Sequence, residues 1–370
     1  MNSSKNYINR RSDLVTFVTF TVGDHLRSEI NQRGSNADIN SLAAFLCIIS
    51  FHQEFADIST DACLLAFKEY SESHQEVVEY LDEQIARSSK DITLSSIINE
   101  FVVPFRQAAD ELAEGEFDFK LVYLEVQDRL NALRDSRRFD QGFAPELTKL
   151  IGELANQSSE KSDGTCYLNT PSGVPAELLA SLDSQISLKV NRVISNSNYI
   201  VQSLHLIALR NGSGIYTVSN PLKGLLNDER KYSSIISLPV FGEKGQRVAQ
   251  DRAITSALGE VHLRNSAKSE EVALVQTYWH LADHGTAYIV VPKNLLFATL
   301  SQPLNSELVE SGSLKSVITL PKGSLVGSGL NLVLIIVQKG EAREGTTFIE
   351  AAGGHLEDLG EISRVLNLQS

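Results

Sequence analysis

Hydrophobic residues recur at helical spacing through the first part of the chain. Leu42, Phe45 and Ile49 follow one another at steps of three and four residues. This period places apolar side chains on one face of a helix. Acidic residues recur with similar spacing over residues 69–83, which is typical of a solvent-exposed helix face. The pattern predicts a helical N-terminal domain over residues 1–156.

The pattern changes after a polar stretch at residues 156–164, where short β-rich runs begin to alternate with helical segments. Strands separated by helices predict a doubly wound, mostly parallel sheet covered on both faces, which makes residues 165–370 an α/β domain. Ligands of such sheets bind where strands end. The predicted strands are Thr165–Leu168, Ile186–Val190, Ile215–Ser219, Ser233–Pro239, Thr286–Pro292, Leu314–Leu320 and Leu332–Gln338, with helices at Asn198–Arg210 and Ser269–Ala282.

Length and composition agree with two folded domains. A chain of 370 residues with 42% hydrophobic and 21% charged residues can build ordinary cores, so a disordered chain and a small disulfide-stapled fold are excluded. The three cysteines show no paired spacing, and no apolar run near the start is long enough to span a bilayer. We expect a cytoplasmic protein without a membrane segment.

The net charge of −13 is unevenly distributed. Residues 1–150 carry −10, whereas residues 184–250 carry eight basic and three acidic residues. An acidic chain argues against DNA binding in general, because phosphate contacts use clustered Lys and Arg. The local excess of basic residues removes that objection for residues 184–250.

Several segments, taken in order, resemble the N6-adenine DNA methylases, specifically the modification subunits of type I restriction systems. Residues 279–297 are similar to that family's helix, glycine turn and strand ending in Val-Pro. Residues 314–323 and 327–339 are similar to its closing strand pair. The likeness spans most of the chain. Its other segments are Tyr232-Ser-Ser-Ile-Ile-Ser-Leu-Pro-Val-Phe-Gly242, Cys166-Tyr-Leu-Asn-Thr-Pro-Ser-Gly-Val-Pro-Ala-Glu-Leu-Leu179, Asp24-His-Leu-Arg27 and Gln141-Gly-Phe-Ala-Pro145.

The resemblance implies a methyltransferase fold, S-adenosylmethionine as cofactor and adenine in DNA as substrate. By this resemblance, the catalytic Asn-Pro-Pro-Phe segment corresponds to Leu238, Pro239, Val240 and Phe241. The implied cofactor positions are Phe143, Pro145, Asn169, Gly173, Asn191 and Asn220.

These positions depart from the family pattern in ways that bear on chemistry. The family's amide accepts a hydrogen bond from the target amine and its aromatic residue stacks on the flipped base. Leu238 has no acceptor in its side chain, and Phe241 either stacks on a base or packs into the core. Asn169 replaces an acid of the family, and Val174 and Pro175 follow Gly173 where small residues would be expected. We expect donor binding to be weak or lost.

An observation independent of the family supports the same view, since no Asp or Glu occurs between Asp183 and Asp228. Doubly wound folds usually hold the ribose of a nucleotide cofactor with a carboxylate at the end of the second strand. Here the second and third strands end near Asn191 and Asn220. An amide at each of these positions would hold the ribose more weakly than a carboxylate.

The basic residues after these strands form a candidate DNA surface. The segment at residues 243–252 is polar and basic, as expected of a loop that follows phosphates, and a solvated surface loop is an equal alternative. The candidate DNA-binding residues are Lys223, Arg230, Lys231, Lys244, Arg247 and Arg252.

Other site chemistry finds no support. His280 and His284 have the spacing of metal ligands on a helix, but without cysteines nearby a surface pair is favoured, so we predict no metal. No nucleophile triad, phosphate-binding loop or CxxC pair is present.

The sequence thus predicts a methylase-like subunit of a DNA-modification or restriction system that has lost catalysis and acts in DNA binding or complex assembly. Its expected partners are DNA and other subunits of a modification, restriction or defence complex. Two alternatives stay open: an active S-adenosylmethionine-dependent N6-adenine methyltransferase with a divergent pocket, and a protein scaffold that does not meet DNA.

Overall fold

The chain forms two compact units. A computed structural model describes residues 118–133, 142–159, 165–170, 173–191, 205, 209, 216–218, 231–242, 268–297, 306, 308–340, 345–350, 355, 356, 359, 360 and 362. Residues 1–138 with 195–213 make the first unit, and residues 139–194 with 214–370 make the second.

In the first unit, the described part is helical, in agreement with the hydrophobic spacing. Helix α7 (Phe119–Leu133) buries Val122, Tyr123 and Val126 on one face. The Tyr123 ring meets the ring of His205 edge-on, with centroids 5.9 Å apart. His205 and Leu209 are both helical, as the prediction for Asn198–Arg210 requires.

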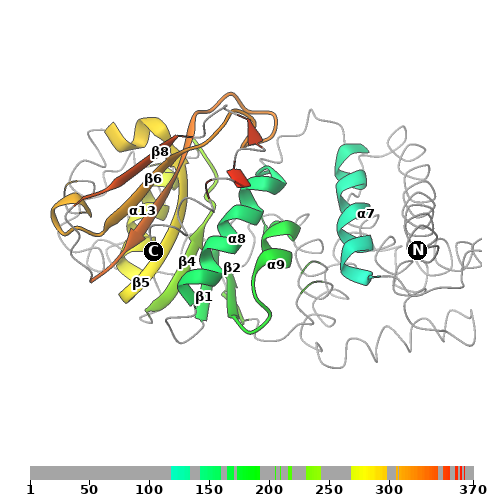
Figure 1. The fold of residues 1–370 in the computed structure, drawn as a ribbon, viewed down its shortest axis with the longest axis horizontal. Helices are drawn as coiled ribbons and strands as arrows, with labels where there is room; N and C mark the ends of the chain where they lie inside the picture. Colours follow the sequence, from blue (N-terminus) through cyan, green and yellow to red (C-terminus); the bar gives the residue numbers. More distant parts are fainter. Residues whose placement is uncertain are drawn as a thin grey trace, which may run out of the picture. The chain divides into compact units, whose positions relative to one another are not determined.

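The second unit is an α/β unit whose sheet has the strand order β3-β2-β1-β4-β5-β7-β6-β8 (Figure 1). Each of the seven predicted strands is present. Strand β7 runs antiparallel to both of its neighbours, and the other pairings are parallel. The strands are β1 (Thr165–Asn169), β2 (Ser187–Asn191), β3 (Tyr216–Val218), β4 (Tyr232–Ser237), β5 (Leu281–Pro292), β6 (Leu314–Thr319), β7 (Leu332–Gln338) and β8 (Thr347–Glu350).

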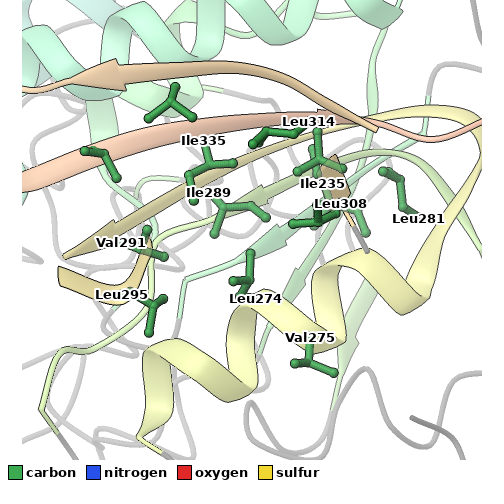
Figure 2. Packing of buried hydrophobic residues seen from close by; sticks show 14 of the residues in the cluster. Ile235, Leu274, Val275, Leu281, Ile289, Val291, Leu295, Leu308, Leu314 and Ile335 are labelled. Atoms are coloured by element: carbon green, nitrogen blue, oxygen red, sulfur yellow. The ribbon is translucent and has the colours of Figure 1, made fainter. Parts of the chain in front are cut away.

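Alternating side chains of the central strands build two cores, one on each face of the sheet. On one face, Ile235, Ile289 and Ile335 pack with Leu274 and Val275 of helix α13 (Ser269–His280) (Figure 2). Runs of buried apolar residues without polar alternation are typical of strands that are covered on both sides. The short 3-10 helix η4 (Lys293–Phe297) follows β5 and adds Leu295 to this core.

The other face is covered by helices α8 (Pro145–Ser159) and α9 (Ala176–Ser181), which lie against each other (Figure 1). Their contact is close at Gly152, where a Cβ would lie 1.9 Å from Ser181 Oγ. The buried Tyr288 hydroxyl of β5 donates to the Leu154 carbonyl of α8 at 2.7 Å. Helix α8 therefore belongs to the α/β unit.

The division between the units consequently falls at residues 138 and 139, upstream of the predicted boundary at residue 156. Sequence patterning assigned α8 to the helical region because it is an amphipathic helix that precedes the first strand. The same patterning gives no information about which core the apolar face of such a helix joins.

The junction between α13 and β5 also differs from the prediction. The helix ends at His280 and the strand begins at Leu281, before the predicted helix end at residue 282. His284 adopts a positive φ of 64°, and a Cβ on Gly285 would lie 3.0 Å from the Ser233 carbonyl oxygen of β4. Gly285 thus permits a close approach of β5 to β4 beside their register shift.

Candidate functional site

The carboxyl ends of β1 and β4 lie side by side at the sheet edge where the sequence places its candidate site. Asn169 and Ser237, the last residues of these strands, pair in register and are both buried. Asn169 Nδ2 donates to Ser237 Oγ at 3.1 Å, and the Leu238 backbone N–H donates to the Asn169 carbonyl at 2.9 Å. The predicted positions Asn169 and Leu238 are therefore brought together around a neutral amide–hydroxyl pair.

The corner after β4, residues 238–242, presents little polar side-chain chemistry. Leu238 is 2% exposed and Phe241 is 6% exposed. Pro239 is also buried, and Val240 is half-buried. Gly242 turns the chain with a φ of 77°, a conformation that residues with a Cβ rarely adopt. The side chain of Leu238, at the position predicted to correspond to the family's amide, is thus a buried hydrocarbon.

The N-terminus of α13 holds this corner in place. The Glu270 carboxylate accepts the Gly242 backbone N–H at 3.1 Å, and Ser269 Oγ donates to the Val240 carbonyl at 2.5 Å. Glu270 is 3% exposed. Sequence reasoning missed both residues. An acid in the first turn of a predicted helix is a general helix-start pattern, and it does not identify a hydrogen-bond partner 28 residues away.

Phe143, which the sequence predicts as a cofactor position, also lies at this corner. Phe143 forms an isolated bridge with Leu325 of the loop after β6, and the Ala144 N–H donates to the Ser324 carbonyl. The Phe143 ring meets the Phe241 ring edge-on, with centroids 5.9 Å apart. The structure therefore joins Phe143 to the predicted catalytic corner. The exposed Pro145 opens α8, where its fixed φ suits the first helical position.

The loop after β1 is described in part. The Gly173 N–H donates to the Thr170 carbonyl at 2.9 Å, and Gly173 has a φ of 111°, so this glycine turns the chain after β1. Val174 is buried, and Pro175 precedes α9 without a side-chain cap. Thr170 Oγ1 is buried and has no hydrogen-bond partner among the described residues.

Several predicted residues cannot be placed. Asn191 ends β2, as predicted, and its backbone pairs with Val218 of β3. The side chain of Asn191, and the whole of Asn220, Lys223, Arg230, Lys244, Arg247 and Arg252, lie outside the described residues.

Lys231 is the one predicted DNA-binding residue within the described part, and it lies at the amino end of β4. The corner at residues 238–242 follows the opposite end of the same strand. The structure therefore does not bring Lys231 together with that corner.

The described strand ends fit poorly with S-adenosylmethionine bound in the usual way. They offer amide and hydroxyl groups at Asn169, Ser237 and Thr170, whereas such cofactors are commonly held by a strand-end carboxylate. The nearby Glu270 carboxylate is already hydrogen-bonded to the Gly242 N–H. Among the described residues at the ends of β1 and β4, the polar side chains are thus amide and hydroxyl groups.

The histidine pair does not form a metal site. His280 ends α13 and is buried, whereas His284 is exposed on β5, so the predicted surface pair is wrong for His280. The two residues do not share a helix face because the helix ends between them. Among the described residues, no group of three His, Cys, Asp or Glu is placed to hold a metal.

No helix within the described ranges has the length and apolar character needed to cross a membrane.

Comparison with known proteins agrees with the fold. Residues 190–361 match the family model described as N-6 DNA methylase. No curated protein matches the chain. The type I restriction-modification methyltransferase subunit from Streptococcus thermophilus is similar in structure, with a TM-score of 0.65, 16% identity, and coverage of 97% of this chain and 94% of that one.

Two further solved structures show the same fold at low identity. A class I S-adenosylmethionine-dependent methyltransferase from Listeria monocytogenes has a TM-score of 0.56 at 11% identity, covering 90% of this chain and 98% of that one. A modification subunit of a type I restriction enzyme from Vibrio vulnificus has a TM-score of 0.54 at 14% identity, covering 73% and 62%. The resemblance seen in the sequence is thus confirmed: residues 190–361 match the N-6 DNA methylase family, and the α/β unit has the S-adenosylmethionine-dependent methyltransferase fold.

Proposed function

We propose that this protein is a methylase-fold subunit of a DNA-modification or restriction system that does not transfer methyl groups and acts in DNA binding or complex assembly. One observation carries the proposal. Where the family's acid and catalytic amide would stand, the chain has a buried amide–hydroxyl pair, Asn169 with Ser237, followed by the buried Leu238.

Methyl transfer to an adenine amine requires an acceptor that draws the amine into position as the nitrogen attacks. A leucine side chain supplies none, and a polar group that loses its partner in a buried site is penalised by about 1–3 kcal/mol. Glu270 is a poor substitute, because its carboxylate oxygen Oε2 already accepts a hydrogen bond from the Gly242 N–H.

Cofactor binding is weakened by the same replacements. A cationic sulfonium and a ribose diol are both favoured by carboxylates, and the window between Asp183 and Asp228 contains none. The amide Nδ2 of Asn169 donates to Ser237 Oγ within the sheet, which supports this view. We therefore infer that the fold is retained for a purpose other than holding S-adenosylmethionine.

DNA is the partner favoured by charge. Residues 184–250 carry an excess of basic residues, and Lys244, Arg247 and Arg252 follow the corner directly in the sequence. The S. thermophilus relative is a subunit of a type I restriction-modification system, which by analogy suggests other subunits of such a system as partners.

Calorimetric titration of the full chain with S-adenosylmethionine, followed by a labelled-methyl assay on DNA, tests the loss of catalysis. We expect no saturable heat and no label on DNA. Saturable binding accompanied by methyl transfer would instead establish the active methyltransferase with a divergent pocket and would end the proposal.

Gel shifts at two salt concentrations test the role in DNA binding. We expect K244A/R247A to weaken binding and to reduce its salt dependence, since each lost phosphate contact lowers the slope of log K against log salt by about 0.9 for duplex DNA. The matched control is K120A/K149A, which removes the same charge from exposed positions on α7 and α8. Equal weakening by both variants would argue against a DNA surface at residues 243–252.

A role in assembly is tested by purifying the chain from its native host and identifying the proteins that accompany it. Recovery of restriction or modification subunits is the expected result. A chain that neither shifts DNA nor brings such subunits would contradict the proposal.

A further inference from the structure

A polar surface lies at the amino edge of the sheet. It is at the end of β4 opposite to the corner at residues 238–242. Two lysines and two aromatic residues meet there, and we call them the amino-edge patch: Lys231, Tyr278, Trp279 and Lys339. Lys231 precedes β4, Lys339 follows β7, and the aromatic residues belong to the last turn of α13.

Each lysine of the patch lies over one ring and binds one carbonyl. Lys231 Nζ lies 4.8 Å from the Trp279 ring centroid and donates to the Trp279 carbonyl. Lys339 Nζ lies 5.3 Å from the Tyr278 ring centroid and donates to the Leu281 carbonyl at 3.4 Å. Both ammonium groups are thus fixed beside the C-terminus of α13, where its last carbonyls and dipole favour positive charge.

The charge of Lys339 also affects Lys231. Partial burial lowers the pKa of Lys231, and the charge of Lys339 lowers it further, while Asp283 acts in the opposite direction. Two like charges near one carboxylate leave the patch with positive potential. A ligand anion placed between the lysines would relieve their repulsion.

Capping of α13 accounts for the lysines but not for the exposed indole. Trp279 is 39% exposed, although its large apolar ring would be covered if it served only the core. An exposed aromatic ring beside cations is the combination that single-stranded nucleic acids use, since a base stacks on the ring while phosphates meet the cations. Protein interfaces also use Trp, but they tend to exclude Lys.

We propose that the amino-edge patch binds single-stranded nucleic acid, with a base stacked on Trp279 and a phosphate near Lys231 and Lys339. This site goes beyond the proposed function. Lys231 is shared with the predicted DNA-binding residues, but the corner and the basic segment at residues 243–252 are not part of the patch.

Trp279 is the single tryptophan of the chain, so intrinsic tryptophan fluorescence reports on the patch directly. The full chain is titrated with a ten-nucleotide oligothymidine. We expect saturable quenching of tryptophan fluorescence, because stacking brings a base against the indole. The duplex of the same length should quench less, since its bases are already stacked. Absence of saturable quenching would overturn the proposal.

Lysine variants distinguish binding at the amino-edge patch from a general effect of positive charge. K231A/K339A should reduce the slope of log K against log salt by about 0.7, because both lysines contact one phosphate and each single-strand phosphate contact contributes about 0.7. K231R/K339R keeps both positive charges beside the end of α13 and should bind like the original chain. This variant serves as the control for loss of the helix cap. K293A/K322A is the matched control, since these exposed lysines lie near the carboxyl ends of β5 and β6. A control that weakens binding as much as K231A/K339A would refute the site.

Fluorescence anisotropy of a labelled oligonucleotide measures variants without tryptophan. W279A should weaken binding about fivefold or more, the lower bound for loss of one base–aromatic stack. K244A/R247A should still show quenching, so failure of the proposed function and failure of this site are distinguishable. Equal saturable quenching by polyglutamate would identify the patch as a protein-binding surface and overturn the proposal.

Discussion

Removal of the Glu270 carboxylate should loosen the corner after β4 and destabilise the α/β unit. The E270A variant loses the acceptor of the Gly242 N–H, at 3.1 Å, and of the longer Ser269 hydroxyl contact, at 3.4 Å. A hydrogen bond to a charged group contributes about 1.5–3 kcal/mol, and an acid in the first turn of a helix adds about 0.3–1 kcal/mol. Relief of the carboxylate's desolvation offsets part of this sum, so we expect a net loss of about 2 kcal/mol.

Urea denaturation followed by tryptophan fluorescence measures this loss, because Trp279 and Glu270 lie on the same helix. The matched control is E146A, which removes an exposed acid from the first turn of α8 and should cost less than about 1 kcal/mol. E270Q keeps an acceptor oxygen and should fall between the two variants. If E270A and E146A lose the same stability, the corner is not held by the carboxylate and the reasoning is wrong.

Two further predictions concern the face covered by α8. G152A should destabilise by about 1 kcal/mol, since the overpacking cost of about 1–3 kcal/mol against Ser181 exceeds the gain of up to about 1 kcal/mol in helix propensity, and S181G should recover part of it in urea denaturation. Burial raises the pKa of the Tyr288 hydroxyl above its usual 10.0, so its contribution to stability is present below pH 10 and is lost as pH rises above that value. Y288F should cost about 1 kcal/mol at neutral pH and should flatten that alkaline loss, and an unchanged pH profile would contradict this assignment.

The strands of the α/β unit could be predicted from sequence because each is a short apolar run bounded by turn residues. The run that became β7, for example, is seven residues long, rich in Val and Ile, and followed closely by Gly340, and these features favour a strand over a longer helix. The unit to which α8 belongs could not be predicted in the same way, since the apolar face of this helix could pack in either core. Contacts such as that of Tyr288 with Leu154 place α8 in the α/β unit, and these contacts join residues far apart in the chain.

The structure brings together several residues that the resemblance indicated, whereas the contacts made there could not be predicted from the sequence. The resemblance located Phe143, Asn169 and Leu238, and the structure brings two of these, Asn169 and Leu238, into direct contact and places Phe143 against the same corner. Ser237 and Glu270 escaped prediction because a serine in a strand and an acid at a helix start have ordinary local explanations. Their partners become evident once the register of β1 with β4 and the position of α13 are known.

The bridge between Phe143 and Leu325 has a consequence for how the chain folds during synthesis. The segment at residues 142–144 precedes β1, whereas its hydrogen-bond partners at residues 324–326 follow β6. A ribosome must therefore complete most of the sheet before this pairing can form, and the closing contact has a high contact order. We expect the α/β unit to reach protease resistance late, after the β6–β7 loop has emerged, and not strand by strand.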